Sequence, residues 1–394
     1  MRRVSFFVLA AAVTACGNEP QTTEPLAARQ AQLTSAPQYT ADTLPTIGGR
    51  LNRPSGISNR GWVAGFVNRS DNATRVAALW RNGEITELAL DGPNSNVQWP
   101  GITESGIVAG FAEIAELDTL GEAWSCSAFL PTVTGHLCRG IVYDHGVLTA
   151  LPTLGGPNGF AAGVNNRGQV VGWAETPVVD PTCNAPQVLQ FRAVLWDPRK
   201  GTRTELPPLP GDSTSAATAI NDSGVAVGIS GECDVAVGQR SAQHSVLWYQ
   251  GQVTEIGDLG GEMWHTPMAI NQQGDVVGFS NPATVPGATF APHGFLWTKS
   301  GGIVDLQTLL GDATSQAVGI NADRLIVGVS SGPTGNRAVL WLGGGLPIDL
   351  NTLVTGFPHR LIVAQHINDR GVIVARATIT GTTRQVPVVL TPVP

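Results

Sequence analysis

The chain has few charged residues and hardly any lysine. Charged residues make up 13% of its 394 residues, about half the fraction usual in soluble proteins, and the only lysines are Lys200 and Lys299. The net charge is -7 at pH 7. Binding to nucleic acid requires a concentrated basic surface that faces the phosphates. We therefore expect no nucleic-acid partner.

Helical periodicity and the motifs of common catalytic sites are also lacking. The chain contains no H-E-x-x-H motif, no phosphate-binding glycine loop and no long apolar stripe at helical spacing. It does contain 48 Gly and 27 Pro among many Val, Ile and Leu residues, a composition typical of short strands and frequent turns. We expect an all-β protein with no cofactor and no metal, and a non-enzymatic role is favoured.

The apolar run near the N-terminus, residues 4–13, is too short to span a bilayer. It follows Arg2 and Arg3 and precedes Val13-Thr14-Ala15-Cys16, which resembles a bacterial lipobox. This resemblance implies cleavage before Cys16, a signal peptide over 1–15, a lipid anchor on Cys16 and a tether over 16–37. The expected location is the periplasm or the cell surface. The alternative is an ordinary secretory signal with a chance cysteine.

From residue 38 onward a repeat dominates the sequence. Its most constant part is an apolar residue, usually Asn, two variable residues, Gly, and a short apolar run ending in Gly; the copies start at Ile57, Ile102, Val164, Ile220, Ile270, Ile320 and Ile367. An Asn or hydroxyl side chain closes an Asx-type or ST-type turn, and the following Gly accepts positive φ. The turn glycine is replaced once, by Arg324. Each copy therefore begins with a tight hairpin.

A second hairpin follows in each copy. It starts with an apolar run that ends in an aromatic residue, such as Trp80 or Trp341, and continues through a Gly turn into another strand. Each copy thus contains four strands, a to d, and successive copies start 45 to 62 residues apart. This spacing is typical of β-propeller blades.

The two ends of the repeat region complement each other. The seventh copy lacks strand d, whereas residues 39–49 resemble the d strand of the second copy at residues 147–156. A ring in which the first strand completes the last blade protects both open edges. We therefore predict one domain over 38–394, a seven-bladed β-propeller of four-stranded antiparallel blades. The alternative is an open β-solenoid.

The repeat resembles the HAF repeat of probable extracellular bacterial proteins. The residues that carry this resemblance are Ile270 to Gly278 (INQQGDVVG), His244 to Trp248 (HSVLW), His293 to Trp297 (HGFLW) and Asp258 to Gly261 (DLGG). It implies an exported repeat protein and brings no catalytic residues with it. Arginine replaces the family's His in three copies, which argues against a required ligand at that position.

Two recurring side chains are candidates for binding but are better explained by packing. A basic residue lies four positions before the strand c aromatic in five copies: Arg139, Arg192, His244, His293 and Arg337. It could form a cationic ring, but hairpin register places an acid beside four of the five, namely Glu205, Glu255, Asp305 and Asp349. The strand c tryptophans fit blade packing better than ligand stacking.

Long insertions mark one face of the predicted propeller. The segments between strands b and c are long in four consecutive copies, over 111–137, 173–191, 229–243 and 279–292, and they share a face with the d-to-a loops. The d-to-a loops add aromatic and imidazole side chains that we take as the candidate binding face: Trp99, Phe160, Trp264, His265 and Phe357. They could stack on a ligand or plug the channel.

Four cysteines lie in the same insertions. An even number in an exported chain predicts two disulfides, with three possible pairings of Cys126, Cys138, Cys183 and Cys233. We favour Cys126 with Cys138 and Cys183 with Cys233. Zinc binding by His136 and Cys138 is a weaker alternative.

The insertions also carry the acids Glu113, Glu116, Asp118, Glu122, Glu175, Asp180, Glu232 and Asp234. They could form a catalytic pair, bind calcium weakly or simply be solvated. We favour a monomeric, lipid-anchored binding module that recognises a protein, peptide or glycan through the looped face. The alternative is a carbohydrate-acting propeller hydrolase that uses carboxylates of the inserted loops.

Overall fold

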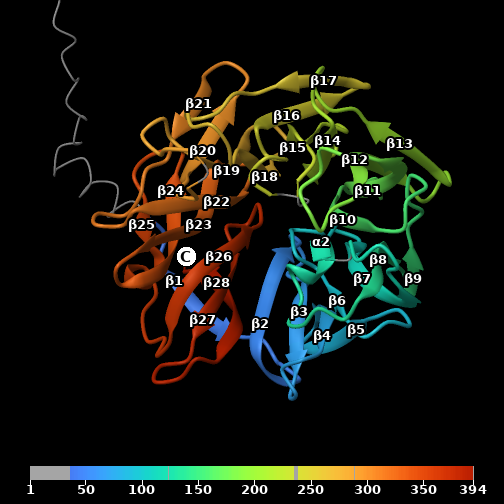
Figure 1. The fold of residues 1–394 in the computed structure, drawn as a ribbon. Coiled ribbons are helices and arrows are strands. Elements are labelled where there is room, and N and C mark those ends of the chain that lie inside the picture. The colour runs from blue at the N-terminus through green and yellow to red at the C-terminus, as the bar shows by residue number, and fades with distance from the viewer. Residues whose placement is uncertain (1–35, 123, 235–237, 288, 394) are drawn as a thin grey trace, which may run out of the picture. The chain divides into compact units, whose positions relative to one another are not determined.

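Seven four-stranded antiparallel sheets follow one another around a centre, as Figure 1 shows by the progression of colour from blue to red. The structure, a computed structural model, describes residues 36–122, 124–234, 238–287 and 289–393. This confirms the predicted seven-bladed β-propeller. The predicted signal peptide, Cys16 and nearly all of the predicted tether lie outside the described residues.

The first three blades contain twelve strands. Blade 1 consists of β2 (Gly48–Ile57), β3 (Val63–Arg69), β4 (Arg75–Arg81) and β5 (Glu84–Leu88). Blade 2 consists of β6 (Ser95–Asn96), β7 (Val108–Leu117), β8 (His136–Asp144) and β9 (Val147–Ala150). Blade 3 consists of β10 (Gly159–Val164), β11 (Val170–Val179), β12 (Leu189–Asp197) and β13 (Thr202–Leu206).

The remaining four blades repeat this arrangement. Blade 4 consists of β14 (Thr214–Ile220), β15 (Ala226–Gly231), β16 (His244–Tyr249) and β17 (Gln252–Glu255). Blade 5 consists of β18 (Thr266–Ile270), β19 (Val276–Ser280), β20 (His293–Thr298) and β21 (Gly302–Asp305). Blade 6 consists of β22 (Thr314–Ile320), β23 (Leu325–Gly332), β24 (Gly335–Leu342) and β25 (Ile348–Asp349). Blade 7 consists of β26 (Arg360–Ile367), β27 (Ile373–Thr378), β28 (Gln385–Pro392) and β1 (Tyr39–Thr43).

The N-terminal strand closes the ring. Strand β1 pairs antiparallel with β28, with Tyr39 opposite Pro392 and Thr43 opposite Val388, and Figure 1 shows blue β1 among the red strands of blade 7. Tyr39 is buried against the core of blades 6 and 7, and its backbone N–H donates to the carbonyl of Leu353 at 2.9 Å. The predicted closure is therefore confirmed.

Helices are short in the described residues. They are α2 (Trp124–Ser127), in the insertion of blade 2, and the 3-10 helix η1 (Leu350–Thr352), after β25. Neither has the length or the apolar content that a bilayer-crossing helix would need.

The asparagine turns of the repeat hold neighbouring blades together. In blade 6, Asn321 Oδ1 accepts the backbone N–H groups of Asp323 and Leu325 at 3.1 and 2.9 Å, which confirms the predicted Asx turn. Its Nδ2 also donates to the carbonyl of Asn368 in blade 7 at 3.1 Å. The same inter-blade bond recurs from Asn165, Asn221, Asn271 and Asn368. This second role of the asparagine could not be read from one copy of the repeat.

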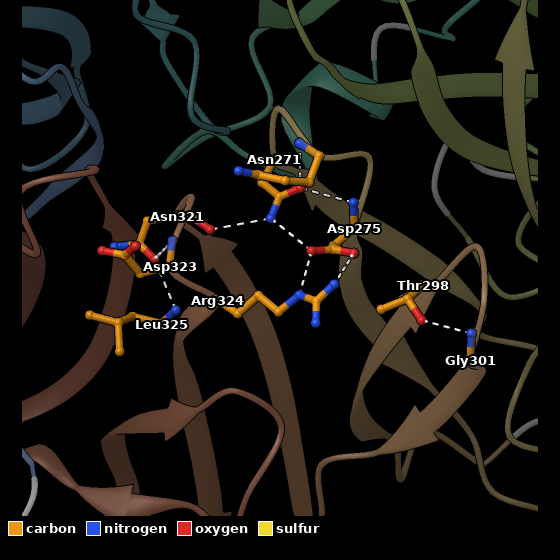
Figure 2. Close-up of polar contacts among 9 residues, drawn as sticks. Asn271, Asp275, Thr298, Gly301, Asn321, Asp323, Arg324 and Leu325 are labelled. Carbon is orange, nitrogen blue, oxygen red and sulfur yellow. Dashed lines mark hydrogen bonds and ion pairs between the residues drawn. The ribbon is translucent and has the colours of Figure 1, made fainter.

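Arg324 occupies the turn position that is glycine in the other copies. Its φ is 57°, a left-handed conformation that costs a non-glycine residue about 1–2 kcal/mol. Its guanidinium forms a two-pronged ion pair with the buried carboxylate of Asp275 in blade 5, at 2.7 and 3.1 Å (Figure 2). Arg324 thus gives up the conformational freedom of the turn glycine, and the blade gains an ion pair with its neighbour.

A β-bulge recurs where strands a and b pair. The register shifts at the same position in six blades, for example between Ala317 and Gly319 opposite β23. A Cβ atom at Gly328, on the facing strand, would overlap the carbonyl oxygen of Gln316. This close approach explains the glycine that ends the apolar run of the repeat. The bulge leaves one extra residue on strand a, Val318 in blade 6, and turns its side chain towards the channel.

Candidate functional site

The inserted segments of blades 2 and 3 are partly strand rather than loop. Strands β7 and β11 continue to Leu117 and Val179, where they pair with His136 and Leu189. The predicted loops over 111–137 and 173–191 are thus too long at both ends. Strands b and c of these two blades remain paired beyond the segment that is buried between blades, so their exposed ends are still strand.

Both disulfides follow the favoured pairing. Cys126 of α2 is bonded to Cys138 of β8, and Cys183 of blade 3 is bonded to Cys233 of blade 4. The first pair anchors the insertion of blade 2 to its own blade, and the second joins two neighbouring insertions. Because Cys138 is consumed in a disulfide, it cannot serve as a zinc ligand with His136.

Trp99 and Phe160 are buried rather than exposed, in line with the alternative that these aromatic side chains plug the channel. They are 5% and 1% exposed and belong to an aromatic cluster with Phe129 and Trp173, with ring centroids 4.1 to 5.7 Å apart. Phe160 lies in strand β10, not in a loop. These rings plug the channel on the side of blades 2 to 4, because apolar side chains from several strands a and b converge there.

The other three predicted binding residues are not members of this cluster. His265 is buried; its ring nitrogens contact Ser280 Oγ at 2.8 Å and the Gly261 carbonyl at 3.1 Å, and burial lowers its pKa. Trp264 packs edge-on against Phe290, with centroids 5.0 Å apart. Phe357 packs against His359 in blade 7. The five residues therefore do not form one surface.

A cavity of about 320 Å³ occupies the rest of the channel at the looped end. Strands a and b of blades 5, 6, 7 and 1 contribute most of its wall, and Gln98, Trp99 and Phe129 of blade 2 close it on the side of the aromatic plug. The bulge residues Met268 and Val318 also line it. It includes Phe129 of the blade 2 insertion and therefore lies at the end of the channel that carries the inserted segments.

Arg53 and Arg376 line this cavity without a carboxylate partner. Arg53 comes from β2 and Arg376 from β27, and the Nε atoms of both are buried and make no hydrogen bond to a described residue. None of the described residues that line the cavity is acidic. Arginines in the described part of the chain do form ion pairs with carboxylates, but neither Arg53 nor Arg376 is among them.

A third arginine lies beside this pair but is held by the protein. Arg75 Nε donates to Asn68 Oδ1 at 3.0 Å, its Nη1 donates to the Phe129 carbonyl, and its guanidinium lies 3.8 Å from the centre of the Phe66 ring. Burial lowers the pKa of Arg53 to about 9, with further contributions from the charges of Arg376 and Arg75. Because arginine keeps its charge at neutral pH, positive charge gathers at this end of the channel, from Arg53 and Arg376 in the cavity wall and from Arg75 beside them.

The repeat itself contained a signal for Arg376. The strand b residue after the glycine is apolar in the other six blades: Phe66, Phe111, Trp173, Ile229, Phe279 and Val329. In blade 7 the corresponding pair is Ala375-Arg376. A comparison of the copies with one another at this position would have singled out Arg376.

The opposite end of the channel has a smaller cavity, of about 210 Å³, with an acidic rim. Its carboxylates belong to Glu104, Asp222 and Asp369, and each accepts a backbone N–H of a neighbouring blade at 2.8 to 3.0 Å. His366 lines this cavity too, and burial lowers its pKa to about 4. These carboxylates are used to hold the blades together.

The acids of the insertions are also engaged in structure. Glu122 accepts the backbone N–H groups of Val188 and Leu189, and Glu175 accepts that of Asn158 at 2.8 Å. Glu113 accepts from Asn94 at 2.8 Å and from Thr134. None of these acids lines the channel cavity at the looped end. Glu122 and Glu175 do form a pair, since both accept from the amide of Gln187 at 3.3 and 3.1 Å, but both are buried, at 0% and 3% exposed.

Hairpin pairing explains the recurring basic residues. Arg192 contacts Glu205 at 3.4 Å, and Arg337 contacts Asp349 at 3.6 Å. His244 and His293 bond their predicted acids, Glu255 and Asp305, at 2.8 Å. All four predicted pairs are present, so these residues do not form a cationic ring around the channel.

Residues 328–332 (GVSSG) match the G-x-S-x-G pattern of esterases. Ser330 lies within strand β23, whereas the esterase motif requires a sharp turn between a strand and a helix. The Ser330 hydroxyl is buried; it donates to Asp312 at 2.7 Å and accepts the Leu309 N–H at 3.0 Å. Ser330 therefore serves to hold the segment before β22 against strand β23, and the match to the esterase pattern has no catalytic meaning here.

Comparison with known proteins identifies the fold alone. No family model and no curated protein sequence matches the chain. An acylaminoacyl peptidase in complex with Z-Gly-Gly-Phe-chloromethyl ketone superposes with a TM-score of 0.50 at 14% identity, over 86% of this chain and 51% of that chain. The β-propeller domain of the Trilobed protease from Pyrococcus furiosus has a TM-score of 0.50 at 10% identity, over 87% and 95%. This chain thus spans about half the length of the peptidase.

Proposed function

We propose that this protein is a binding module whose ligand enters the channel cavity on the inserted face. The observation that carries this proposal is the cavity of about 320 Å³, which combines aromatic and amide side chains with two arginines that lack carboxylate partners. Ligand sites are usually concave, largely apolar and supplied with a few converging polar groups. This volume lies at the small end of the range of about 300–1,000 Å³ for such sites.

Binding without catalysis is favoured over carbohydrate hydrolysis. Glycoside hydrolysis ordinarily requires two carboxyl groups on either side of the scissile bond. The described lining of the cavity offers none, and the buried acids of the insertions accept backbone N–H groups elsewhere. The hydrolase alternative would need a substrate site outside this cavity.

A thermal-shift screen of the intact protein against sugars, sugar acids, amino acids and nucleosides tests the proposal. Asn336 is exposed at the rim of the cavity, so Asn336→Trp should obstruct the entrance without disturbing the core. Val304→Trp, at an exposed position of β21, is the matched control. Ligands should stabilise the wild type and Val304→Trp but not Asn336→Trp.

Two results would contradict this proposal. If no compound stabilises the protein, or if Asn336→Trp binds as well as the wild type, the cavity is not the binding site. Mass spectrometry of each mixture detects turnover. Products that form only with active protein would favour the hydrolase alternative.

For the location, we propose a lipid-anchored protein at the cell envelope. The two disulfides indicate an oxidising compartment, and the resemblance to HAF-repeat proteins supports export. The lipobox-like Val13-Thr14-Ala15-Cys16 supports anchoring. Cys16→Ser should move the protein from the membrane fraction to the soluble fraction. Unchanged fractionation would refute lipidation.

A further inference from the structure

We infer that Arg53 and Arg376 bind the carboxylate of a single-ring sugar acid in the channel cavity. This inference rests on the proposed binding function and adds the chemical class of the ligand. It is carried by the two arginines together with the amide and aromatic groups around them.

The charges of the cavity select an anion. Two guanidinium groups with buried, unbonded Nε atoms face a space whose described lining contains no acid. Both side chains are half-buried. A carboxylate matches the planar fork of a guanidinium with two parallel hydrogen bonds, and it would give each buried Nε–H an acceptor. A zwitterion such as an amino acid would leave its ammonium group without a partner, so a net anion fits best.

The third arginine keeps this charge in place. Arg75 is fixed by Asn68 and by the Phe129 carbonyl, so it cannot turn away from Arg53. Its charge and that of Arg376 are among the causes that lower the pKa of Arg53. An anion bound between Arg53 and Arg376 would relieve this repulsion.

The rest of the wall suits the body of a sugar. The amides of Gln98, Gln316 and Gln365 can each donate to and accept from a hydroxyl group. The rings of Phe129 and Phe279 offer apolar surface to the carbon face of a ring. Inorganic phosphate would satisfy the arginines but would leave the amides and the aromatic wall unused.

The size of the cavity limits the ligand to about one ring. A volume of about 320 Å³ is near the lower limit for ligand pockets, and the plug that contains Trp99 and Phe160 blocks extension towards blades 3 and 4. A longer chain could extend only outward, past Asn336 at the rim. Monosaccharide acids are therefore the appropriate probes.

Isothermal titration of the intact protein with D-glucuronate and D-galacturonate tests the inference, with D-glucose, D-galactose and inorganic phosphate as comparisons. At least one uronate should bind about 10- to 100-fold more tightly than its neutral parent, as expected for charge-assisted hydrogen bonds. Arg376→Gln and Arg53→Gln should each abolish this preference. Arg370→Gln, in an exposed turn of the same blade, should retain it.

Arg376→Phe guards against failure to fold. Phenylalanine occupies this position in three other blades, as Phe66, Phe111 and Phe279, so the variant should fold with at least the wild-type melting temperature while losing uronate binding. Such a result separates recognition from a merely structural role of Arg376.

Several results would overturn the inference while leaving the proposed function intact. These are equal affinity for acid and neutral sugar, phosphate binding as tight as uronate binding, and uronate binding that survives Arg376→Phe. The inference is also overturned if none of the five probes binds. Failure of the wider screen with Asn336→Trp, in contrast, would overturn the proposed function itself.

Discussion

The indole N–H of Trp341 donates a 2.7 Å hydrogen bond to the carbonyl oxygen of Leu306, which directly follows strand β21 of the preceding blade. Three other strand c tryptophans make the same bond across a blade boundary: Trp80 to Pro45, Trp196 to Pro152 and Trp248 to Pro207. All four are at most 2% exposed. Each tryptophan thus fills the space between two blades and also fixes their relative position.

Trp341→Phe should lower the free energy of unfolding by about 1–3 kcal/mol, because it keeps an aromatic ring but leaves the Leu306 carbonyl without its partner. Chemical denaturation measures this change. Trp297→Phe is the control, since Trp297 is only partly buried and makes no such bond to a described residue. Equal losses in the two variants would show that packing alone matters.

Asn321→Asp should also destabilise the ring, by about 1–3 kcal/mol. The aspartate can still accept the turn N–H groups of Asp323 and Leu325, but it cannot donate to the carbonyl of Asn368. Denaturation of the variant, beside Asn72→Asp in the β3–β4 turn as control, measures the inter-blade bond. A stability equal to that of the wild type would mean that the turn is the residue's only role.

Deletion of residues 38–44 should lower the free energy of unfolding by more than about 3 kcal/mol. It removes the partner strand of β28 and the buried ring of Tyr39, and burial of one large side chain alone contributes about 1.5–3 kcal/mol. Alanine at the exposed positions Asp42 and Thr43 keeps the strand and should have little effect. A cooperative transition at the wild-type midpoint after deletion would contradict the observed closure.

Glu175→Gln should change how stability depends on pH. Burial, and then the charge of Glu122, raises the pKa of Glu175 from its ordinary value of 4.5 to about 7. Between these pH values the folded chain holds a proton on Glu175 that the unfolded chain has lost. The contribution of Glu175 to the free energy of unfolding is therefore fully present below about pH 4.5 and is lost as the pH rises through 7. A pKa difference of this size corresponds to about 3 kcal/mol.

The measurement is the difference in unfolding free energy between Glu175→Gln and the wild type from pH 4.5 to 8. It should increase with pH by up to about 3 kcal/mol, because the neutral amide cannot lose a proton. Taking this difference cancels the titration of groups that do not interact with Glu175, including His366, which acts in the opposite direction. The exposed Glu84→Gln should run parallel to the wild type, and a parallel Glu175→Gln profile would disprove the raised pKa.

The fold could be predicted because each blade repeats the same local signals. Asn321, its turn and the strand c tryptophan Trp341 recur with spacing that fixes four strands per copy, and the match between residues 39–49 and 147–156 reveals the closing strand. The disulfide pairing also followed from placing each cysteine in its insertion. These inferences depend on order along the chain, which the sequence contains directly.

The binding site could not be located in the same way, because it depends on which side chains meet across the channel. Trp99 and Phe160 were expected at the surface since their segments look like loops, yet both pack into the aromatic plug. Arg53 and Arg376 lie far apart in the sequence and become neighbours only because β2 of blade 1 packs beside β27 of blade 7 at the ring closure. The repeat pattern shows where a residue lies within its blade, but not which side chains of other blades it contacts.

The one-sided aromatic plug has a consequence for ligand orientation. A ring of seven similar blades would offer a small molecule several near-equivalent poses related by rotation about the central axis. The rings of Trp99, Phe160 and Trp173 remove the poses on one side, and the guanidinium groups at the junction of the last and first blades distinguish the remaining ones. The scaffold is thus nearly symmetric in its backbone but directional in its interior, which allows a single pose to be favoured over its rotated copies.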